Sequence, residues 1–184
     1  MKKLVNNKRV LCIVALVLVF SVCFATAVKV SKADRLSDEY RRGRNSRRSI
    51  TLSEEEYKLF VCIVYCEAGG ENYDCQLGVA NVILNRIKMD GWPNTLKEVV
   101  YQKHQFSPVT NGYLNKSLRE YAQGKFNTKW HESCFKAVDD ALAGKNNIGN
   151  RQYFMTAEAL KRVLGNNYYD RKDIGKTAFF NTNW

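Results

Sequence analysis

The chain has 184 residues, of which 45% are hydrophobic and 26% charged, a length that allows one domain with terminal appendages. Its formal net charge of +11 is unevenly spread, because residues 1–48 hold twelve of the 29 Lys and Arg but only three of the 18 Asp and Glu. Residues 49–184 are therefore almost neutral. A nucleic-acid-binding domain would carry basic charge on its folded surface, so the composition argues against a nucleic-acid partner.

The N-terminal segment, residues 1–28, is expected to direct export. Four basic residues precede an uncharged, mostly apolar run from Val10 to Val28, and Ala25-Thr26-Ala27 matches a small-x-small cleavage site. The run is also long enough to span a bilayer as an uncleaved anchor, so both a cleaved signal peptide and a retained anchor stay open. The basic flank places the residues after Lys29 outside the cytoplasm.

Residues 29–50 are expected to be a basic linker between this segment and the folded domain, residues 51–184. Five arginines crowd the linker between residues 41 and 48, where apolar residues are few, as in a solvated tether. The same charge would also suit contact with an anionic wall polymer or lipid headgroups. We therefore expect a secreted or membrane-anchored protein.

Helix signals dominate the domain. Ser53-Glu54-Glu55-Glu56 is a capping box, and apolar residues at helical spacing follow it. Gly91-Trp92-Pro93 ends a second periodic stretch. Helices are predicted at residues 53–67, 73–88, 95–101 and 129–143, a loop at 102–113, and strands at 151–154 and 177–180. About 130 residues suffice for one core, so we expect an α+β, mostly helical single domain with a small β-sheet.

Four cysteines lie in the domain and could form two disulfides outside the cytoplasm. Cys66 and Cys75 flank a glycine pair and are the favoured partners, whereas Cys62 and Cys66 are one helical turn apart. A zinc site that joins Cys62 and Cys66 to His131 and Cys134 is an alternative. However, neither CxxC nor HExxH spacing is present, so we expect no metal and no other cofactor.

Two glutamates stand either side of that glycine pair in Glu67-Ala68-Gly69-Gly70-Glu71. Glu67 follows Phe60 and Val64 at helical spacing, which places it on the buried face of its helix. A carboxyl in an apolar setting is costly unless a partner or a function requires it. From spacing alone, Glu67 is either a catalytic acid or a structural acid paired with a buried arginine.

Several segments, taken in order, resemble the SleB/CwlJ-type family of spore cortex-lytic cell-wall hydrolases. The segments are Glu67-Ala68-Gly69-Gly70-Glu71, Gly78-Val79-Ala80-Asn81-Val82-Ile83-Leu84-Asn85-Arg86, Trp92-Pro93-Asn94-Thr95, Gln105-Phe106-Ser107 and Tyr153-Phe154. The resemblance covers nearly all of residues 54–180. It implies a lysozyme-like, largely helical fold that cleaves the glycan strands of peptidoglycan, usually as a lytic transglycosylase.

In that family one glutamate does the acid–base work, and its position falls on Glu67. For Glu71 we favour a supporting role, such as ordering the loop or binding substrate. The alternative is the nucleophile or base of a hydrolysing muramidase, because four residues across a Gly-Gly turn could set the two carboxyls roughly 5–10 Å apart. Gln105, Phe106 and Tyr153 are candidate sugar contacts, since amide and aromatic faces suit N-acetyl sugars. Core packing is the alternative for the two aromatic residues.

Two further residues next to each other, Asn85 and Arg86, are expected to be structural or to pair with an acid. The chain departs from the family pattern at Cys66, where glycine is usual, and at Gly69, where arginine is usual. Loss of an arginine beside the catalytic acid would alter the pKa of that acid or its grip on substrate.

The expected partner is the peptidoglycan glycan strand, and the N-terminal segment could also contact a membrane. A non-catalytic wall-binding or germination protein with the same fold is the alternative from a different functional class. Nothing in the sequence indicates an oligomeric state.

Overall fold

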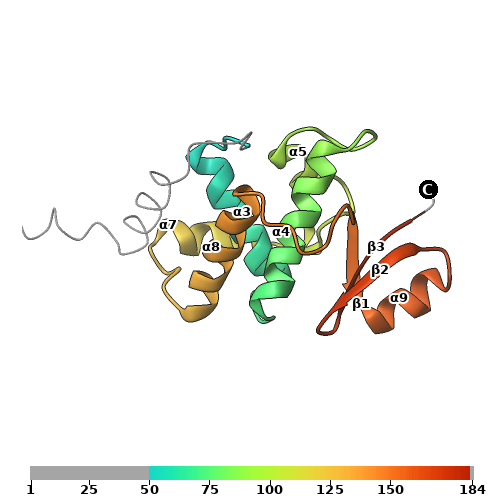
Figure 1. Ribbon diagram of the computed structural model, residues 1–184. Helices are drawn as coiled ribbons and strands as arrows, with labels where there is room; N and C mark the ends of the chain where they lie inside the picture. The colour runs from blue at the N-terminus through green and yellow to red at the C-terminus, as the bar shows by residue number, and fades with distance from the viewer. Residues whose placement is uncertain (1–49, 183–184) are drawn as a thin grey trace, which may run out of the picture. The chain divides into compact units, whose positions relative to one another are not determined.

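The computed structural model describes residues 50–182 (Figure 1). The predicted export segment and the predicted linker up to residue 49 lie outside the described residues. Within residues 50–182, no helix combines the length and the apolar character needed to cross a membrane.

The described residues form seven helices and a three-stranded sheet. The elements are α3 (Glu54–Ala68), α4 (Tyr73–Lys88), α5 (Leu96–Tyr101), α6 (Ser107–Thr110), α7 (Tyr113–Ala122), α8 (Lys129–Leu142), β1 (Tyr153–Thr156), α9 (Ala157–Leu164), β2 (Tyr169–Ile174) and β3 (Thr177–Asn181). The expected mostly helical domain with a small sheet is therefore confirmed.

The first two helices begin where the sequence signals predict. Ser53 and Glu56 form the capping box of α3: the Ser53 N–H donates to Glu56 Oε2 at 2.9 Å, and the Glu56 N–H donates to Ser53 Oγ at 3.2 Å. Asn72 caps α4, since its side-chain oxygen accepts the Cys75 N–H at 2.9 Å. The Asn72 cap borders the short turn between the helices, in which Gly69 and Gly70 lie.

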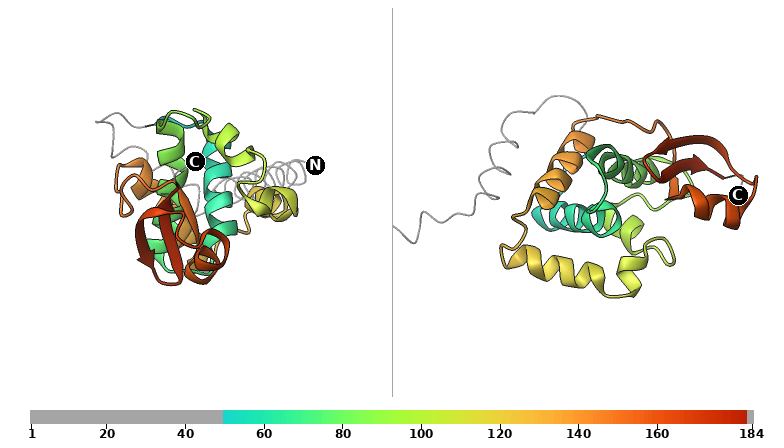
Figure 2. Two further views of the ribbon diagram at one scale, coloured as in Figure 1. Left: turned by 90° about the vertical axis from the view of Figure 1, so that its right-hand side faces the viewer. Right: turned by 90° about the horizontal axis from the view of Figure 1, so that it is seen from below.

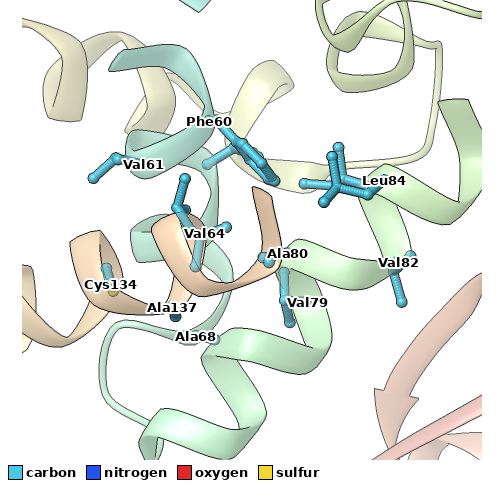
Figure 3. Close-up of a cluster of buried hydrophobic side chains, with 14 of the residues drawn as sticks. Phe60, Val61, Val64, Ala68, Val79, Ala80, Val82, Leu84, Cys134 and Ala137 are labelled. Carbon is cyan, nitrogen blue, oxygen red and sulfur yellow. The ribbon is translucent and has the colours of Figure 1, made fainter. Parts of the chain in front are cut away.

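Helix α3 lies at the centre of the helical part, between α4 on one side and α7 on the other (Figure 2). Its buried side chains pack against those of α4 and α8, as Figure 3 shows for Phe60, Val64, Val79 and Cys134. Burial of this apolar face stabilises the helix far more than its intrinsic propensity does. The last turn of α3 is thereby held in place by packing on several sides.

The sheet has the strand order β1-β3-β2, with both pairs antiparallel. Tyr153 pairs with Phe180, and every residue of the central strand β3 is buried. Phe179 of β3 packs so tightly against α4 that a Cβ at Gly78 would lie 2.5 Å from its ring. Glycine at this position therefore allows the sheet to approach α4 closely.

Several elements differ from the sequence-based predictions. Strand β1 lies two residues later than predicted, and the predicted loop at 102–113 contains the short helix α6. Helices α7 and α9 and strand β2 were not predicted. Five of the six residues of β2 are exposed, so the strand lacks the alternation that marks a half-buried strand, and a register shift interrupts its pairing with β3. Pairing with β3 rather than local sequence creates this strand.

Candidate active site

The Glu67 side chain extends from the last turn of α3 and is partly buried. Its Oε1 atom is fully buried and has no hydrogen-bond partner among residues 50–182. Burial raises the pKa of Glu67 from its ordinary value of 4.5 to about 7, while the nearby positive charge of Arg86 acts in the opposite direction. The carboxyl can therefore both donate and accept a proton near neutral pH.

Arg86 lies near the end of α4 and is only 3% exposed. Its Nε donates to the backbone oxygen of Gln152 at 2.8 Å. Three aromatic rings surround its guanidinium carbon, which lies 4.2 Å from the ring centre of Trp92, 5.3 Å from that of Phe106 and 5.5 Å from that of Tyr153. We call these three rings the aromatic cage. Such contacts stabilise a cation that is shielded from water.

The charge state of Arg86 is also affected by its surroundings. Burial lowers the pKa of Arg86 to about 10, so the side chain stays protonated at neutral pH. Its Nη1 atom is buried and, within the part of the chain that the structure describes, has no hydrogen-bond partner. Unpaired buried donors and acceptors cost free energy, so the two unpaired atoms of Glu67 and Arg86 mark a place where a ligand could supply hydrogen bonds.

Neighbouring contacts hold the aromatic cage in place. The Trp92 Nε1–H donates to Gln152 Oε1 at 2.6 Å, and the Trp92 ring meets the Tyr153 ring edge-on at 5.6 Å. Asn85 donates from Nδ2 to the backbone oxygens of Gly149 at 2.7 Å and Arg151 at 2.8 Å. Asn85 therefore has the structural role expected of it, because it holds the segment before β1 against α4.

Glu71 lies in the turn after α3 and is partly exposed. The turn is fixed through the backbone of Glu71: its N–H donates to Ala68 O at 3.0 Å, and its carbonyl oxygen accepts from Gln76 Nε2 at 3.1 Å. Gln76 is fully buried and accepts in turn from the Ser133 hydroxyl at 2.6 Å. The structure thus connects the turn that bears Glu71 to helix α8.

Of the three candidate sugar contacts, the structure brings Phe106 and Tyr153 together around Arg86. Phe106 is 2% exposed, so it acts mainly as a wall of the cage. Gln105 precedes it on the same loop and is partly buried, and its N–H donates to Gln102 O at 3.2 Å.

Sequence reasoning gave no role in the site to Trp92, Gln102 or Gln152. Trp92 was interpreted as part of a turn and of one segment that resembles the family. Gln102 has a buried Oε1 that is unpaired within residues 50–182. One signal for these residues was present in the sequence, which is Arg86. A charged side chain near an apolar helix face needs partners that offset the free-energy cost of its burial.

The favoured disulfide between Cys66 and Cys75 is not formed, because all four cysteines of the domain are free. The Cys75 Sγ lies 3.4 Å from Thr177 Oγ1 on β3, whereas Cys66 lies beside Ser117 of α7. The two thiols therefore contact different elements. In the described part of the chain, no group of three His, Cys, Asp or Glu side chains is placed to hold a metal ion.

Comparison with known proteins places this geometry in context. The family model described as Cell Wall Hydrolase matches residues 70–180, a range that begins just after Glu67. The spore cortex-lytic enzyme of Bacillus cereus is 32% identical over 127 residues, which cover 69% of this chain and 44% of that protein. The corresponding enzyme of Oceanobacillus iheyensis is 30% identical over 127 residues, which cover 69% of this chain and 42% of that protein. The chain therefore spans less than half the length of these curated relatives.

Two solved structures are also similar. The catalytic domain of the germination-specific lytic transglycosylase SleB from Bacillus anthracis superposes with a TM-score of 0.58 at 27% identity, covering 71% of this chain and 98% of that domain. The catalytic domain of Bacillus cereus SleB gives 0.57 at 28% identity, covering 74% and 99%. The expected lysozyme-like fold is thereby confirmed. Since the family model matches more than half of the chain, this protein belongs to the cell wall hydrolase family.

Proposed function

We propose that this protein cleaves the glycan strands of peptidoglycan as a lytic transglycosylase, with Glu67 as its acid–base residue. The single observation that carries the proposal is the Glu67 carboxyl, which has a buried, unpaired oxygen and a pKa raised to about 7. General acid catalysis is most effective when the pKa of the acid lies near the working pH. The SleB and spore cortex-lytic relatives support peptidoglycan as the substrate class.

In the first step, protonated Glu67 donates its proton to the glycosidic oxygen between N-acetylmuramic acid and N-acetylglucosamine. The bond from that oxygen to the muramic acid C1 breaks, and positive charge develops on the ring. The departing sugar keeps the electron pair and the new proton, while Glu67 becomes a carboxylate. The adjacent Arg86 cation stabilises this carboxylate as it forms.

In the second step, the Glu67 carboxylate removes a proton from the C6 hydroxyl of the same muramic acid. The C6 oxygen then bonds to C1 and closes an anhydro ring, so no water is consumed and Glu67 regains its proton. One carboxyl suffices for both steps. This agrees with the supporting role expected of Glu71, whose backbone is anchored in the turn.

Further parts of the proposal concern the whole chain. Residues 51–184 would form the catalytic domain, and residues 1–28 would export or anchor it so that it acts outside the cytoplasm. A role in cortex lysis during germination follows from the relatives that the chain resembles, which are named as spore cortex-lytic enzymes.

The test is digestion of purified cortex and vegetative peptidoglycan by the full chain, compared with Glu67→Gln and, as the matched acid control, Glu71→Gln. Mass spectrometry of the products identifies the new ends. We expect anhydro-muramic ends, a loss of at least ~100-fold in rate for Glu67→Gln, and a much smaller loss for Glu71→Gln. Reducing ends with equal losses in both variants would instead indicate a muramidase. Undiminished digestion by Glu67→Gln would rule out the proposed role of Glu67.

A further inference from the structure

A second feature, separate from the aromatic cage, is a pocket of about 440 Å³ on the α7 side of α3. It is lined by the last turn of α3, by α7 and by the start of α8. Cys66 and Gly69, which stand either side of Glu67 in the sequence, contribute to its walls. Helices α4 and α7 lie on opposite sides of α3 (Figure 2), and the lining includes residues of α7 but none of α4, the helix that carries Arg86. Its volume is within the range of ligand-binding pockets.

One wall of this pocket depends on the absence of a side chain at Gly69. A Cβ there would lie 2.5 Å from the backbone oxygen of Tyr65 and 2.6 Å from its ring, so the ring of Tyr65 folds over the glycine. The ring is held from behind by His131 at 4.4 Å and by Phe126 at 5.2 Å. An arginine, which is usual at this position in the family pattern, would displace Tyr65. Glycine at position 69 therefore allows the Tyr65 ring to form this wall of the pocket.

Two exposed aromatic side chains belong to the lining. Trp130 is 44% exposed and Tyr113 is 62% exposed, and both belong to the pocket. A single exposed aromatic residue is common on protein surfaces, but exposed aromatic residues gathered in one pocket mark a place for a ligand. Their flat faces suit the apolar face of a pyranose ring, while the indole N–H and the phenol O–H can bond to its hydroxyl and amide groups.

The charges in the lining favour an uncharged ligand. Lys116 and Glu120 lie one helical turn apart on α7, with Nζ 3.9 Å from Oε1, so their charges largely offset each other. A stem peptide of peptidoglycan carries free carboxylates and would call for an unpaired cation. N-acetylglucosamine carries none, and its amide can pair with the polar groups of the lining.

We propose that this pocket binds an N-acetylhexosamine of the glycan strand, outside the two sugars joined by the scissile bond. The inference rests on the proposed function and extends it, because it assigns a second place on the enzyme that holds the same polymer. Gly69 and Gly70 belong to the lining and follow Glu67 closely in the sequence, so a strand bound in the pocket would lie against the turn that follows the acid. Binding there would help to position the scissile bond.

The binding test uses the full chain with Glu67→Gln, titrated with a β-1,4-linked tetramer of N-acetylglucosamine and followed by tryptophan fluorescence and calorimetry. Trp130→Ala and Tyr113→Ala are each expected to weaken binding by roughly tenfold, as is typical when an aromatic contact is removed from a binding site. Tyr169→Ala is the matched control, since Tyr169 is 50% exposed on β2 and does not line the pocket. A free stem peptide serves as competitor. Unchanged affinity in both pocket variants, or displacement of the sugar by the peptide, would overturn the proposal.

The kinetic test separates this inference from the proposed function. With wild-type Glu67, Trp130→Ala is expected to raise KM for glycan strands roughly tenfold while kcat changes little, because the residue contacts a sugar remote from the broken bond. A fall in kcat with KM unchanged would contradict the subsite. If the wild-type chain cleaves no wall material, the proposed function fails, yet the binding titration still decides whether the pocket holds the sugar.

Discussion

The Glu67 carboxyl and the Arg86 guanidinium carry opposite charges and interact electrostatically. Each also has one buried atom without a hydrogen-bond partner within residues 50–182. They do not neutralise each other as a fully bonded structural pair would. Burial dominates at Glu67 and raises its pKa, while Arg86 limits the rise. The pair is thus arranged to let the acid change its protonation state.

The first prediction concerns the charge of Arg86. Arg86→Met removes the cation that lowers the pKa of Glu67, so that pKa should rise further above 7. Activity requires protonated Glu67 and declines as pH rises through its pKa, so the basic limb of the pH–rate profile should move to higher pH. The carboxylate formed during the reaction also loses its stabilising neighbour, and kcat should fall roughly 10- to 100-fold.

Arg86→Lys is the control for this variant, because it keeps a positive charge but loses the planar group that the aromatic cage surrounds. We expect it to retain more of the wild-type pH profile than Arg86→Met does. Circular dichroism of both variants checks that the fold is intact. A basic limb at the same pH in all three proteins would show that Arg86 does not act on Glu67.

The second prediction follows from linkage between the pKa of Glu67 and stability. The pKa is 4.5 in the unfolded chain and about 7 in the folded one, so the folded state binds the proton more tightly. The contribution of Glu67 to the free energy of unfolding is therefore fully present below pH 4.5 and is lost as the pH rises through 7. Glu67→Gln should therefore stabilise the protein at pH 8, by up to about 3 kcal/mol, relative to its effect at pH 4.5.

Urea unfolding of the wild type and of Glu67→Gln at both pH values measures this difference. Glu71→Gln provides the reference, because it removes a carboxyl that lies in the turn and is partly exposed. If Glu67→Gln changed the free energy of unfolding equally at the two pH values, the pKa of Glu67 would not be raised in the folded protein.

The third prediction concerns the contact between α4 and the sheet. Gly78→Ala places a Cβ 2.5 Å from the Phe179 ring, which is itself fully buried and cannot move away freely. Overpacking of this kind typically costs about 1–3 kcal/mol, which outweighs the gain in helix propensity of up to about 1 kcal/mol. Thermal unfolding should show a lower Tm. Gly70→Ala is the matched control, because a Cβ at Gly70 meets nothing within 4 Å and should leave the Tm nearly unchanged.

The fourth prediction concerns Asn85. Asn85→Ala removes the donor shared by the backbone oxygens of Gly149 and Arg151 and should destabilise the fold by about 1–3 kcal/mol. Since this segment leads to Tyr153, activity should fall as well. Asn166→Ala, at an exposed position, should alter neither property. Full activity in Asn85→Ala would mean that the segment before β1 does not position the site.

Much of the helical part of the fold was predictable because its signals are local. The capping box at Ser53 and the apolar spacing of α3 placed Glu67 on a buried helix face, and the structure has it there. The surroundings of Arg86 were not predictable in the same way. Gln152 and Tyr153 lie more than 60 residues further along the chain, and only the folded sheet brings them to α4.

The disulfide prediction was wrong for a related reason. Cys66 and Cys75 are close in sequence, but they lie on two different helices, α3 and α4, with the glycine turn between them. Cys75 contacts Thr177 of β3, whereas Cys66 lies on the side of α3 that faces α7. Proximity along the chain gave no information about these directions.

The attachment of the sheet along α4 has a consequence for how substrate enters. Cys75 contacts Thr177 near the start of α4, Gly78 receives the Phe179 ring one turn later, and Arg86 bonds to Gln152 near the end. Hinge bending between sheet and helices would break several of these contacts together, so it is costly in this protein. Under the proposed function, the glycan polymer must then reach Glu67 without such bending, and loose or nicked strands should be attacked before taut ones.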